Sequence, residues 1–300
     1  MSWLADIFFP KRAITLFMTL VVKNEEDIIE QHIRFHCAMG VDGFIVSSHN
    51  CTDGTNSILQ KLKNEGLVRE ILYRTTPEHQ HRVWVNEMMQ IAKKKYKADW
   101  IINSDADEFY YSTKLNLKES IAECHGANLL EVDSIFLFPS TNKDFLKNSY
   151  FVTRPFQAFE AKMLGINNDS RYEDFIGPQG CTKVILKMKD VLKLVDGNHD
   201  AKMRRPVRAH TAGIRLYHYH IRSYKGWEEK VARWQEAVFK MPGSMGEHMK
   251  KMVLLYQKGE LPKEFEAKFG DSMKEFLLQQ GVVSYDPSVC NFLLYKNIIN

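Results

Sequence analysis

Three carboxylates fall within four positions of the sequence, at Asp105, Asp107 and Glu108. An apolar run that ends at Ile102 precedes them, and aromatic residues from Phe109 follow. Like charges this close raise one another's pKa values and destabilise a fold unless a cation or a proton offsets them. Carboxylate oxygens suit Mg²⁺ or Mn²⁺, which proteins usually hold through one or two carboxylates and the phosphate oxygens of a substrate. A cation held here would neutralise a diphosphate and make it a competent leaving group.

The spacing of the three acids separates their expected roles. Asp105 and Asp107 are two residues apart, so an extended strand points both side chains to one side, and a turn lets both reach one cation. Glu108 is then expected to face elsewhere and to brace the loop by accepting backbone hydrogen bonds, with contact to the acceptor's hydroxyls as the alternative role. A solvated loop at a strand end, or the N-cap of a helix, is the alternative interpretation of the same triplet.

The elements that must position these acids alternate between strand and helix in the first third of the chain. A continuous apolar run of β-forming residues predicts a strand over 14–22, and a further apolar run predicts a strand that ends at the acids. Between them we predict shorter strands over 43–47 and 68–72. Helical spacing predicts the helices between them, the last over 82–96. This alternation predicts a mostly parallel sheet flanked by helices, whose ligands bind beyond the carboxyl ends of the strands.

Polar stretches stand at three of those strand ends, over 23–27, 47–55 and 103–108. Because parallel strands end at the same edge of a sheet, we expect the three stretches to outline one site. Further along the chain the pattern loosens. It predicts strands over 130–138, 181–188 and 215–220, a loop-rich stretch over 141–180, and helices over 227–239 and 245–256. We expect one α/β domain over residues 1–225 and a helical C-terminal extension over 226–300.

Composition bounds the class of protein. The 300 residues are 44% hydrophobic and 26% charged, as in an ordinary globular protein, and the net charge of +4 does not indicate a nucleic-acid partner. Five widely spaced cysteines without a Cys-x-x-Cys pair suit a reducing cytoplasm better than a disulfide framework. No apolar run reaches the ~20 residues of a spanning helix, and the start lacks the apolar core of a signal peptide.

Four motifs together resemble those of a family 2-type glycosyltransferase of the GT-A fold, close to the subgroup related to glycosyltransferase family 92. The resemblance covers about residues 14–235. In chain order the motifs are Val22-Lys23-Asn24-Glu25, Asn50-Cys51-Thr52-Asp53-Gly54-Thr55, Asp105-Ala106-Asp107-Glu108-Phe109, and His218-Tyr219-x-x-Arg222-Ser223 with Lys230 beyond.

The resemblance implies a nucleotide-sugar donor and an inverting transfer of its sugar to a glycan or glycolipid. It implies that Asp107 is the principal metal ligand and that Asp105 reaches the metal or the ribose. Asp53 would bond the nucleobase, with Asn24 and Glu25 near the nucleoside. The second motif opens here on Ser48-His49-Asn50 instead of the family's Asp-Asn, so the resemblance points to uracil, and to a UDP-sugar, without fixing the base.

Histidine and basic residues complete the expected metal site. His218 and His220 alternate with aromatic residues, so a strand would place both on one face. Relatives of this fold often take a third metal ligand from a late histidine, and His218 matches that position; an imidazole nitrogen favours Mn²⁺ over Mg²⁺. Arg222 and Lys230 would hold the diphosphate. A pair of half-buried histidines and an ordinary helix surface at Lys230 are the alternatives.

The catalytic base is the least determined residue. An inverting transfer needs a carboxylate or histidine within hydrogen-bond reach of the acceptor hydroxyl. We favour Asp174, which follows Glu173 among aromatic residues, with His199 second. A plain loop is the alternative for both segments.

Two other classes of function stay open: a Mg²⁺-dependent phosphoryl-transfer enzyme or nuclease, and a non-catalytic module that binds nucleotide sugars. The apolar and basic segment 1–12 and the basic stretch 93–97 allow, at most, weak peripheral attachment to the inner face of a membrane. Packing of segment 1–12 against the sheet is the alternative. A bacterial surface glycan such as lipopolysaccharide or capsule is the acceptor that the resemblance favours.

Overall fold

The structure is a computed structural model, and it describes residues 13–78, 80–139, 144–154, 182–195, 198–211, 213–235, 238–240 and 247–300. Contacts between residues divide the chain into two compact units. The first comprises Met1–Ala106, Tyr110–Val132 and Thr182–Arg215. The second comprises Asp107–Phe109, Asp133–Cys181 and Leu216–Asn300. The predicted boundary between residues 225 and 226 stays a prediction.

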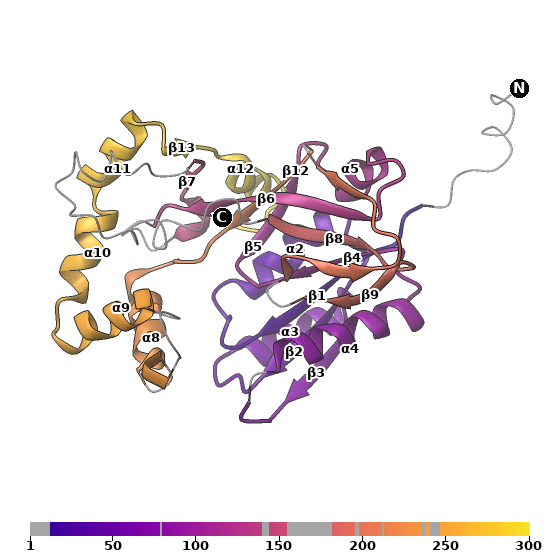
Figure 1. Cartoon of the computed structure of the whole chain (residues 1–300), viewed down its shortest axis with the longest axis horizontal. Helices are drawn as coiled ribbons and strands as arrows, with labels where there is room; N and C mark the ends of the chain where they lie inside the picture. The colour runs from indigo at the N-terminus through magenta and orange to yellow at the C-terminus, as the bar shows by residue number, and fades with distance from the viewer. Residues whose placement is uncertain are drawn as a thin grey trace, which may run out of the picture. The chain divides into compact units, whose positions relative to one another are not determined.

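The first unit is built on a mostly parallel sheet (Figure 1). Its strand order is β8-β4-β1-β2-β3, and β8 runs antiparallel to β4 while the other neighbours are parallel. The bounds are β1 Leu16–Val22, β2 Gly43–His49, β3 Val68–Arg74, β4 Trp100–Ser104 and β8 Thr182–Lys187. The predicted α/β fold class, with a mostly parallel sheet flanked by helices, is confirmed.

Burial explains why these apolar runs form strands. Every side chain of β2 and of β4 is buried, and only Val21 of β1 is half-buried. Helices cover the sheet: α2 (Ile29–Ala38), α3 (Thr55–Asn64), α4 (His81–Lys94) and α5 (Leu117–Glu123). The apolar face of α4 contributes Met88 and Met89 to a core that includes Phe17 and Ile101.

The first unit also contains short strands that sequence periodicity did not predict. A hairpin is formed by β9 (Val191–Leu194) and β10 (Ala201–Met203), and β11 (Arg208–His210) pairs in parallel with the start of β6 (Leu129–Leu137). The hairpin buries Val191, Leu194 and Met203 in the same core as α4.

The second unit combines short strands with the C-terminal helices. The end of β6 pairs with β7 (Tyr150–Val152) and with β12 (Ile214–His218), and β13 (Val283–Tyr285) pairs with β7. Strand β5 (Glu108–Ser112) pairs with β12. The helices are α8 (Tyr224–Trp234), α9 (Glu247–Gln257), α10 (Leu261–Phe269), α11 (Asp271–Gln279) and α12 (Ser288–Tyr295).

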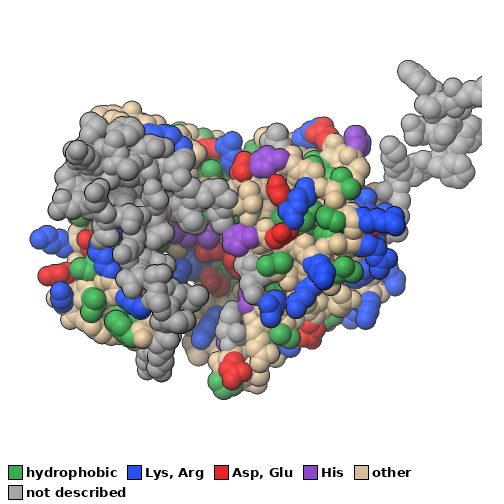
Figure 2. Space-filling model, in the orientation of Figure 1, with side chains coloured by type: hydrophobic (Ala, Val, Ile, Leu, Met, Phe, Trp, Pro, Cys, Tyr) green, Lys and Arg blue, Asp and Glu red, His purple; other side chains and the backbone are tan. Residues whose placement is uncertain are grey.

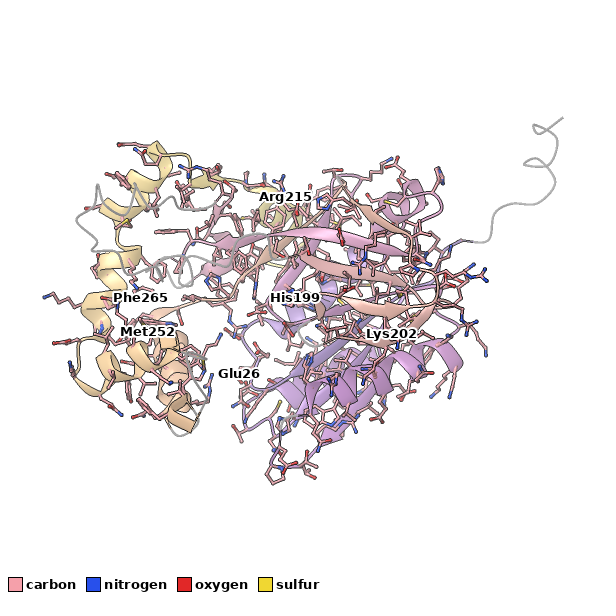
Figure 3. All side chains as sticks on the ribbon, viewed as in Figure 1. Glu26, His199, Lys202, Arg215, Met252 and Phe265 are labelled. Atoms are coloured by element: carbon pink, nitrogen blue, oxygen red, sulfur yellow. The ribbon has the colours of Figure 1, made fainter. Side chains whose placement is uncertain are left out.

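These helices have a core of their own. Trp227 and Val231 of α8, Met252 of α9 and Phe265 of α10 belong to one buried cluster; Figure 3 labels Met252 and Phe265. No helix in the described ranges has the length and apolar character needed to span a bilayer. Residues 1–12, for which we predicted contact with a membrane or with the sheet, lie outside the described residues.

Candidate functional site

Two loops at the carboxyl ends of β1 and β2 are joined by hydrogen bonds within the first unit. The Asn24 side chain accepts a hydrogen bond from the Thr52 backbone N–H at 2.8 Å and donates to the Thr52 hydroxyl at 3.1 Å. The Glu25 N–H donates to the Thr55 hydroxyl at 2.8 Å. Asn24 reaches this position with a φ of 57°, in the left-handed region that asparagine tolerates better than most residues. The first two predicted motifs are therefore neighbours, as expected from a parallel sheet.

Asp53 holds these loops through both of its carboxylate oxygens. Oδ2 accepts from the Glu26 N–H at 3.2 Å, and Oδ1 accepts from the Thr55 N–H at 3.0 Å. Burial raises the pKa of Asp53, but the hydrogen bonds from Thr55 and Glu26 outweigh it and lower the pKa below its usual value. Asp53 thus has a structural role at the start of α3, and its predicted contact with a nucleobase stays a prediction.

Glu26 and Gly54 fit against each other in the same network. Glu26, labelled in Figure 3, accepts from the Gly54 N–H at 2.6 Å. A Cβ atom at Gly54 would lie 2.7 Å from that carboxylate oxygen, so a larger residue would displace it. The glycine of the second motif is explained by this close approach.

Asp105, at the end of β4, lies beside two cationic or potentially cationic side chains of the first unit. Its Oδ2 is 3.6 Å from Lys183 Nζ on β8, and its Oδ1 is 4.0 Å from His81 Nε2 at the start of α4. The Lys183 side chain is only 7% exposed, whereas Asp105 is 42% exposed. Sequence analysis missed both partners, because their proximity comes from the pairing of β4 with β8 and from the packing of α4.

Two buried histidines of α2 contact residues on either side of the acidic motif. The ring of His32 lies 3.4 Å from the hydroxyl of Ser104, which precedes Asp105. His36 accepts a hydrogen bond at Nε2 from the Tyr110 N–H at 2.9 Å. Its Nδ1 is 2.9 Å from the His32 carbonyl, which only accepts, so His36 is the neutral tautomer protonated at Nδ1. Sequence analysis also missed this pair, whose four-residue spacing resembles an ordinary helix face.

Asp107 and His218 are neighbours in the second unit. The Asp107 carboxylate lies 3.4 Å from His218 Nε2, and the two side chains are 24% and 20% exposed. The Asp107 carbonyl accepts from the Tyr219 N–H at 2.7 Å, which fixes the backbone of the acidic turn next to the end of β12. The two predicted metal ligands therefore lie close together, and their role as ligands stays a prediction.

The electrostatic environment keeps Asp107 ionised. Burial raises its pKa, but the His218 ring and the charges of Arg222 and Lys230 lower it far below the usual range of an aspartate. Arg222 lies over the Phe145 ring, 6.0 Å from its centre. His218, Arg222 and Lys230 therefore all act on the Asp107 carboxylate. An ionised carboxylate is the form that binds a metal.

His220 differs from the prediction. Strand β12 ends at His218, so strand alternation does not place His220 on the same face. The two rings are nevertheless 5.6 Å apart, and both contact the Phe136 ring. Burial, helped by the charges of His218 and Lys230, lowers the pKa of His220 to about 3.

Of the two predicted catalytic bases, the structure describes His199 but not Asp174. Asp174 and Glu173 lie outside the described residues. His199, labelled in Figure 3, is on the loop between β9 and β10, and its Nδ1 is 2.9 Å from the Thr182 carbonyl. Because that carbonyl accepts, Nδ1 carries the proton and Nε2 is the basic nitrogen of the neutral ring. Glu108 is fully buried. The base role of His199 and the bracing role of Glu108 stay predictions.

Within the residues that the structure describes, no three His, Cys, Asp or Glu side chains form a ready-made metal cage. Asp107 and His218 fit a site of another kind, in which two protein ligands share a cation with substrate oxygens. An oxygen and a nitrogen ligand suit Mn²⁺. The third predicted ligand, Asp105, has Lys183 beside it instead.

Comparison with protein families identifies a match over residues 18–259 to the model of glycosyltransferase family 92. The chain belongs to glycosyltransferase family 92. The resemblance found in the sequence motifs is thereby confirmed. A comparison with curated proteins finds no match.

Several solved glycosyltransferases are similar in structure. One is S. aureus TarS 1–349 in complex with UDP-GlcNAc, with 14% identity, a TM-score of 0.42, and coverage of 93% of this chain and 80% of that one. Another is glucosyl-3-phosphoglycerate synthase from Mycobacterium tuberculosis, with Mn²⁺, UDP and phosphoglyceric acid. It has 16% identity, a TM-score of 0.30, and coverage of 59% and 56%. The chain spans 44% of the longer S. aureus TarS structure.

Proposed function

We propose that this chain is a metal-dependent glycosyltransferase that moves a sugar from a UDP-sugar donor to a hydroxyl of a glycan or glycolipid. Membership of family 92 supports the reaction class. The observation that carries the metal-dependent part is the Asp107–His218 pair at 3.4 Å, with Arg222 and Lys230 near enough to depress the pKa of that aspartate.

Asp107 and His218 would hold Mn²⁺ or Mg²⁺, and the cation would supply positive charge for the leaving diphosphate. Arg222, by its bidentate fork, and Lys230 would bind diphosphate oxygens. In the first unit, Asn24, Glu25 and Asp53 would bind the nucleoside and Asp105 the ribose. Only Ala106 separates Asp105 from Asp107, so the two Cα atoms stay within about 7 Å of each other.

The transfer we propose is inverting. The acceptor oxygen forms a bond to the anomeric carbon while the bond from that carbon to the diphosphate breaks, and UDP leaves with the electron pair. The acceptor proton goes to a base, for which Asp174 and then His199 are the candidates. The acceptor class we propose is a glycan or glycolipid of bacterial surface polysaccharide or lipopolysaccharide synthesis.

A panel of UDP-sugars tests this function directly. The purified full chain is incubated with each donor, Mn²⁺ and no acceptor, and release of UDP is measured together with the thermal shift that each donor causes. We expect slow Mn²⁺-dependent release from at least one donor and none in excess chelator.

Other outcomes would assign a different class. Stabilisation by a donor without release, even with glycan acceptors added, would indicate a binding module. Cleavage of a nucleic acid in Mg²⁺ would indicate a nuclease. Full UDP release in chelator would remove the metal from the mechanism.

A further inference from the structure

A concave region of the first unit is rich in basic side chains. It is a cavity of about 600 Å³. Its lining is Gly126, Asn128, Lys187, Lys189, Asp190, Arg204 and Arg205. Lys and Arg side chains are numerous on the face of the first unit seen in Figure 2. This cavity concentrates four of them against a single carboxylate, and none of its residues belongs to the motifs discussed above.

The four cations of this cavity differ from a neighbouring arginine in their ion pairing. In the described part of the chain, no salt bridge involves Lys187, Lys189, Arg204 or Arg205. Lys187 instead lies over the Trp100 ring at 5.6 Å. Arg208, which does not line the cavity, differs from them because it forms salt bridges with Glu131 at 3.0 Å and with Asp200 at 2.7 Å.

A buried amide fixes the loop that carries the two arginines. Asn128 is 7% exposed. Its Nδ2 donates to the Arg205 carbonyl at 3.1 Å and to the Asp190 carboxylate at 3.3 Å, and its Oδ1 accepts from the Val207 N–H at 2.8 Å. The Arg204 N–H donates to the Asp190 carbonyl at 2.7 Å. The cationic groups are therefore presented by an ordered backbone.

Arg205 also has a backbone conformation that side chains of its size rarely adopt. Its φ is 54°, in the left-handed region. For a bulky residue this conformation is strained, and such strain persists only where the surroundings enforce it, often at binding sites. The hydrogen bonds of Asn128 enforce it here, so the arginine is held in place at an energetic cost.

We propose that this cavity is a binding site for a phosphate-bearing ligand. Four cations against one carboxylate favour an anion with more than one negative charge. Guanidinium forks match the oxygens of a phosphate in paired hydrogen bonds, and lysine adds charge with less directional demand. A phosphate monoester or a diphosphate has both properties. The inference does not depend on the proposed transferase reaction.

Inorganic pyrophosphate is the probe for a soluble ligand. Its binding to the full chain is measured by calorimetry in excess chelator, so that no metal bridges it to Asp107. The test variant is the double substitution Arg204→Gln and Arg205→Gln, which changes exposed side chains only. The matched control is Lys94→Gln with Lys97→Gln, which removes the same charge from two exposed lysines of the same unit outside the cavity.

We expect the arginine variant to bind pyrophosphate about tenfold or more weakly, since charge-assisted hydrogen bonds are lost, and the lysine variant to bind within about twofold of the parent. A second arm measures co-sedimentation with vesicles of phosphatidylcholine containing phosphatidic acid, which is a lipid phosphate monoester. Vesicle binding that the arginine variant alone loses identifies a lipid phosphate as the source. Pyrophosphate binding without vesicle binding identifies a soluble phosphate.

Equal weakening in both variants would mean that net charge and not the cavity attracts the anion, and the proposal would be wrong. Absence of binding by the parent to both probes would overturn it equally. UDP release with Mn²⁺ is measured in parallel. We expect no change in either variant, so the outcome for this cavity and the outcome for the transferase reaction can be told apart.

Discussion

The ammonium of Lys183 lies 3.6 Å from the carboxylate of Asp105, in an ion pair whose lysine is almost fully buried. A buried ammonium is costly unless an anion accompanies it. The protein itself thus supplies part of the positive charge that offsets the acidic motif, because the Lys183 ammonium lies beside the Asp105 carboxylate. Asp107 differs from Asp105 in its side-chain partner, because its carboxylate lies 3.4 Å from the imidazole of His218.

The first prediction tests that ion pair by a double-mutant cycle. Asp105→Asn removes one negative charge from beside the buried Lys183 ammonium, so we expect a lower free energy of unfolding in urea. Lys183→Met removes the buried charge, and the double variant should recover part of the stability lost in Asp105→Asn. Strict additivity of the two single effects would mean that the pair contributes nothing.

The second prediction concerns His36, which accepts the hydrogen bond of the Tyr110 N–H. His36→Leu leaves that buried donor unsatisfied and should cost about 1–3 kcal/mol of unfolding free energy. His36→Gln offers an acceptor oxygen in a similar volume and should cost less. The measurement is urea unfolding of both variants. If the backbone after the acidic motif is positioned by this bond, the leucine variant alone should also need more Mn²⁺ for UDP release.

The third prediction is a loss of stability in mild acid. Burial, helped by the charge of His32, lowers the pKa of His36 well below the ordinary value near 6.5. Below about pH 6.5 the unfolded chain takes up a proton at this position and the folded chain does not. The contribution of His36 is therefore complete above that pH and falls as the pH decreases towards the folded-state pKa.

The slope from one such histidine is at most about 1.4 kcal/mol per pH unit. His220, whose pKa burial lowers to about 3, contributes with the same sign. Urea unfolding at pH 7, 6 and 5 should show this decline in the free energy of unfolding. In His36→Gln the dependence of that free energy on pH should be smaller by up to about 1.4 kcal/mol per pH unit, the contribution of one proton. An unchanged slope in that variant would show that His36 is not a source of the decline.

The sequence was sufficient where a pattern was long or local. Strands β1, β2 and β4 were predictable because each contains a continuous apolar run, and β3 was predictable from its place in the alternation of strands and helices. The hairpin β9–β10 was not, because its strands have four and three residues and alternate too briefly to differ from a loop. The pairing of Asp107 with His218 followed from the family resemblance alone, since no local pattern joins residues so far apart in the chain.

Other parts of the site depend on tertiary packing and gave no local signal. Lys183 sits in the run Thr182–Lys187, where a lysine among apolar residues resembles the edge of a strand. The roles of His32 and His36 arise only when α2 packs beside the end of β4 and the middle of β5. Asp53 was predicted as a base-binding residue, but the motif alone could not reveal that both its oxygens already hold backbone N–H groups.

The last prediction separates Asp107 from its neighbour Glu108. Asp107→Asn keeps the shape of the side chain and removes the charge that a metal ligand supplies, so UDP release should fall to near background at every Mn²⁺ concentration. Glu108 is fully buried, and its proposed role is to brace the turn by hydrogen bonds, which a glutamine preserves in part. Glu108→Gln should therefore retain most activity with a nearly unchanged Mn²⁺ requirement. The measurement is UDP release across a Mn²⁺ titration, with circular dichroism to confirm that both variants are folded. If a folded Glu108→Gln is as inactive as Asp107→Asn, Glu108 is a metal ligand or an acid–base group, and its assignment as a brace is wrong.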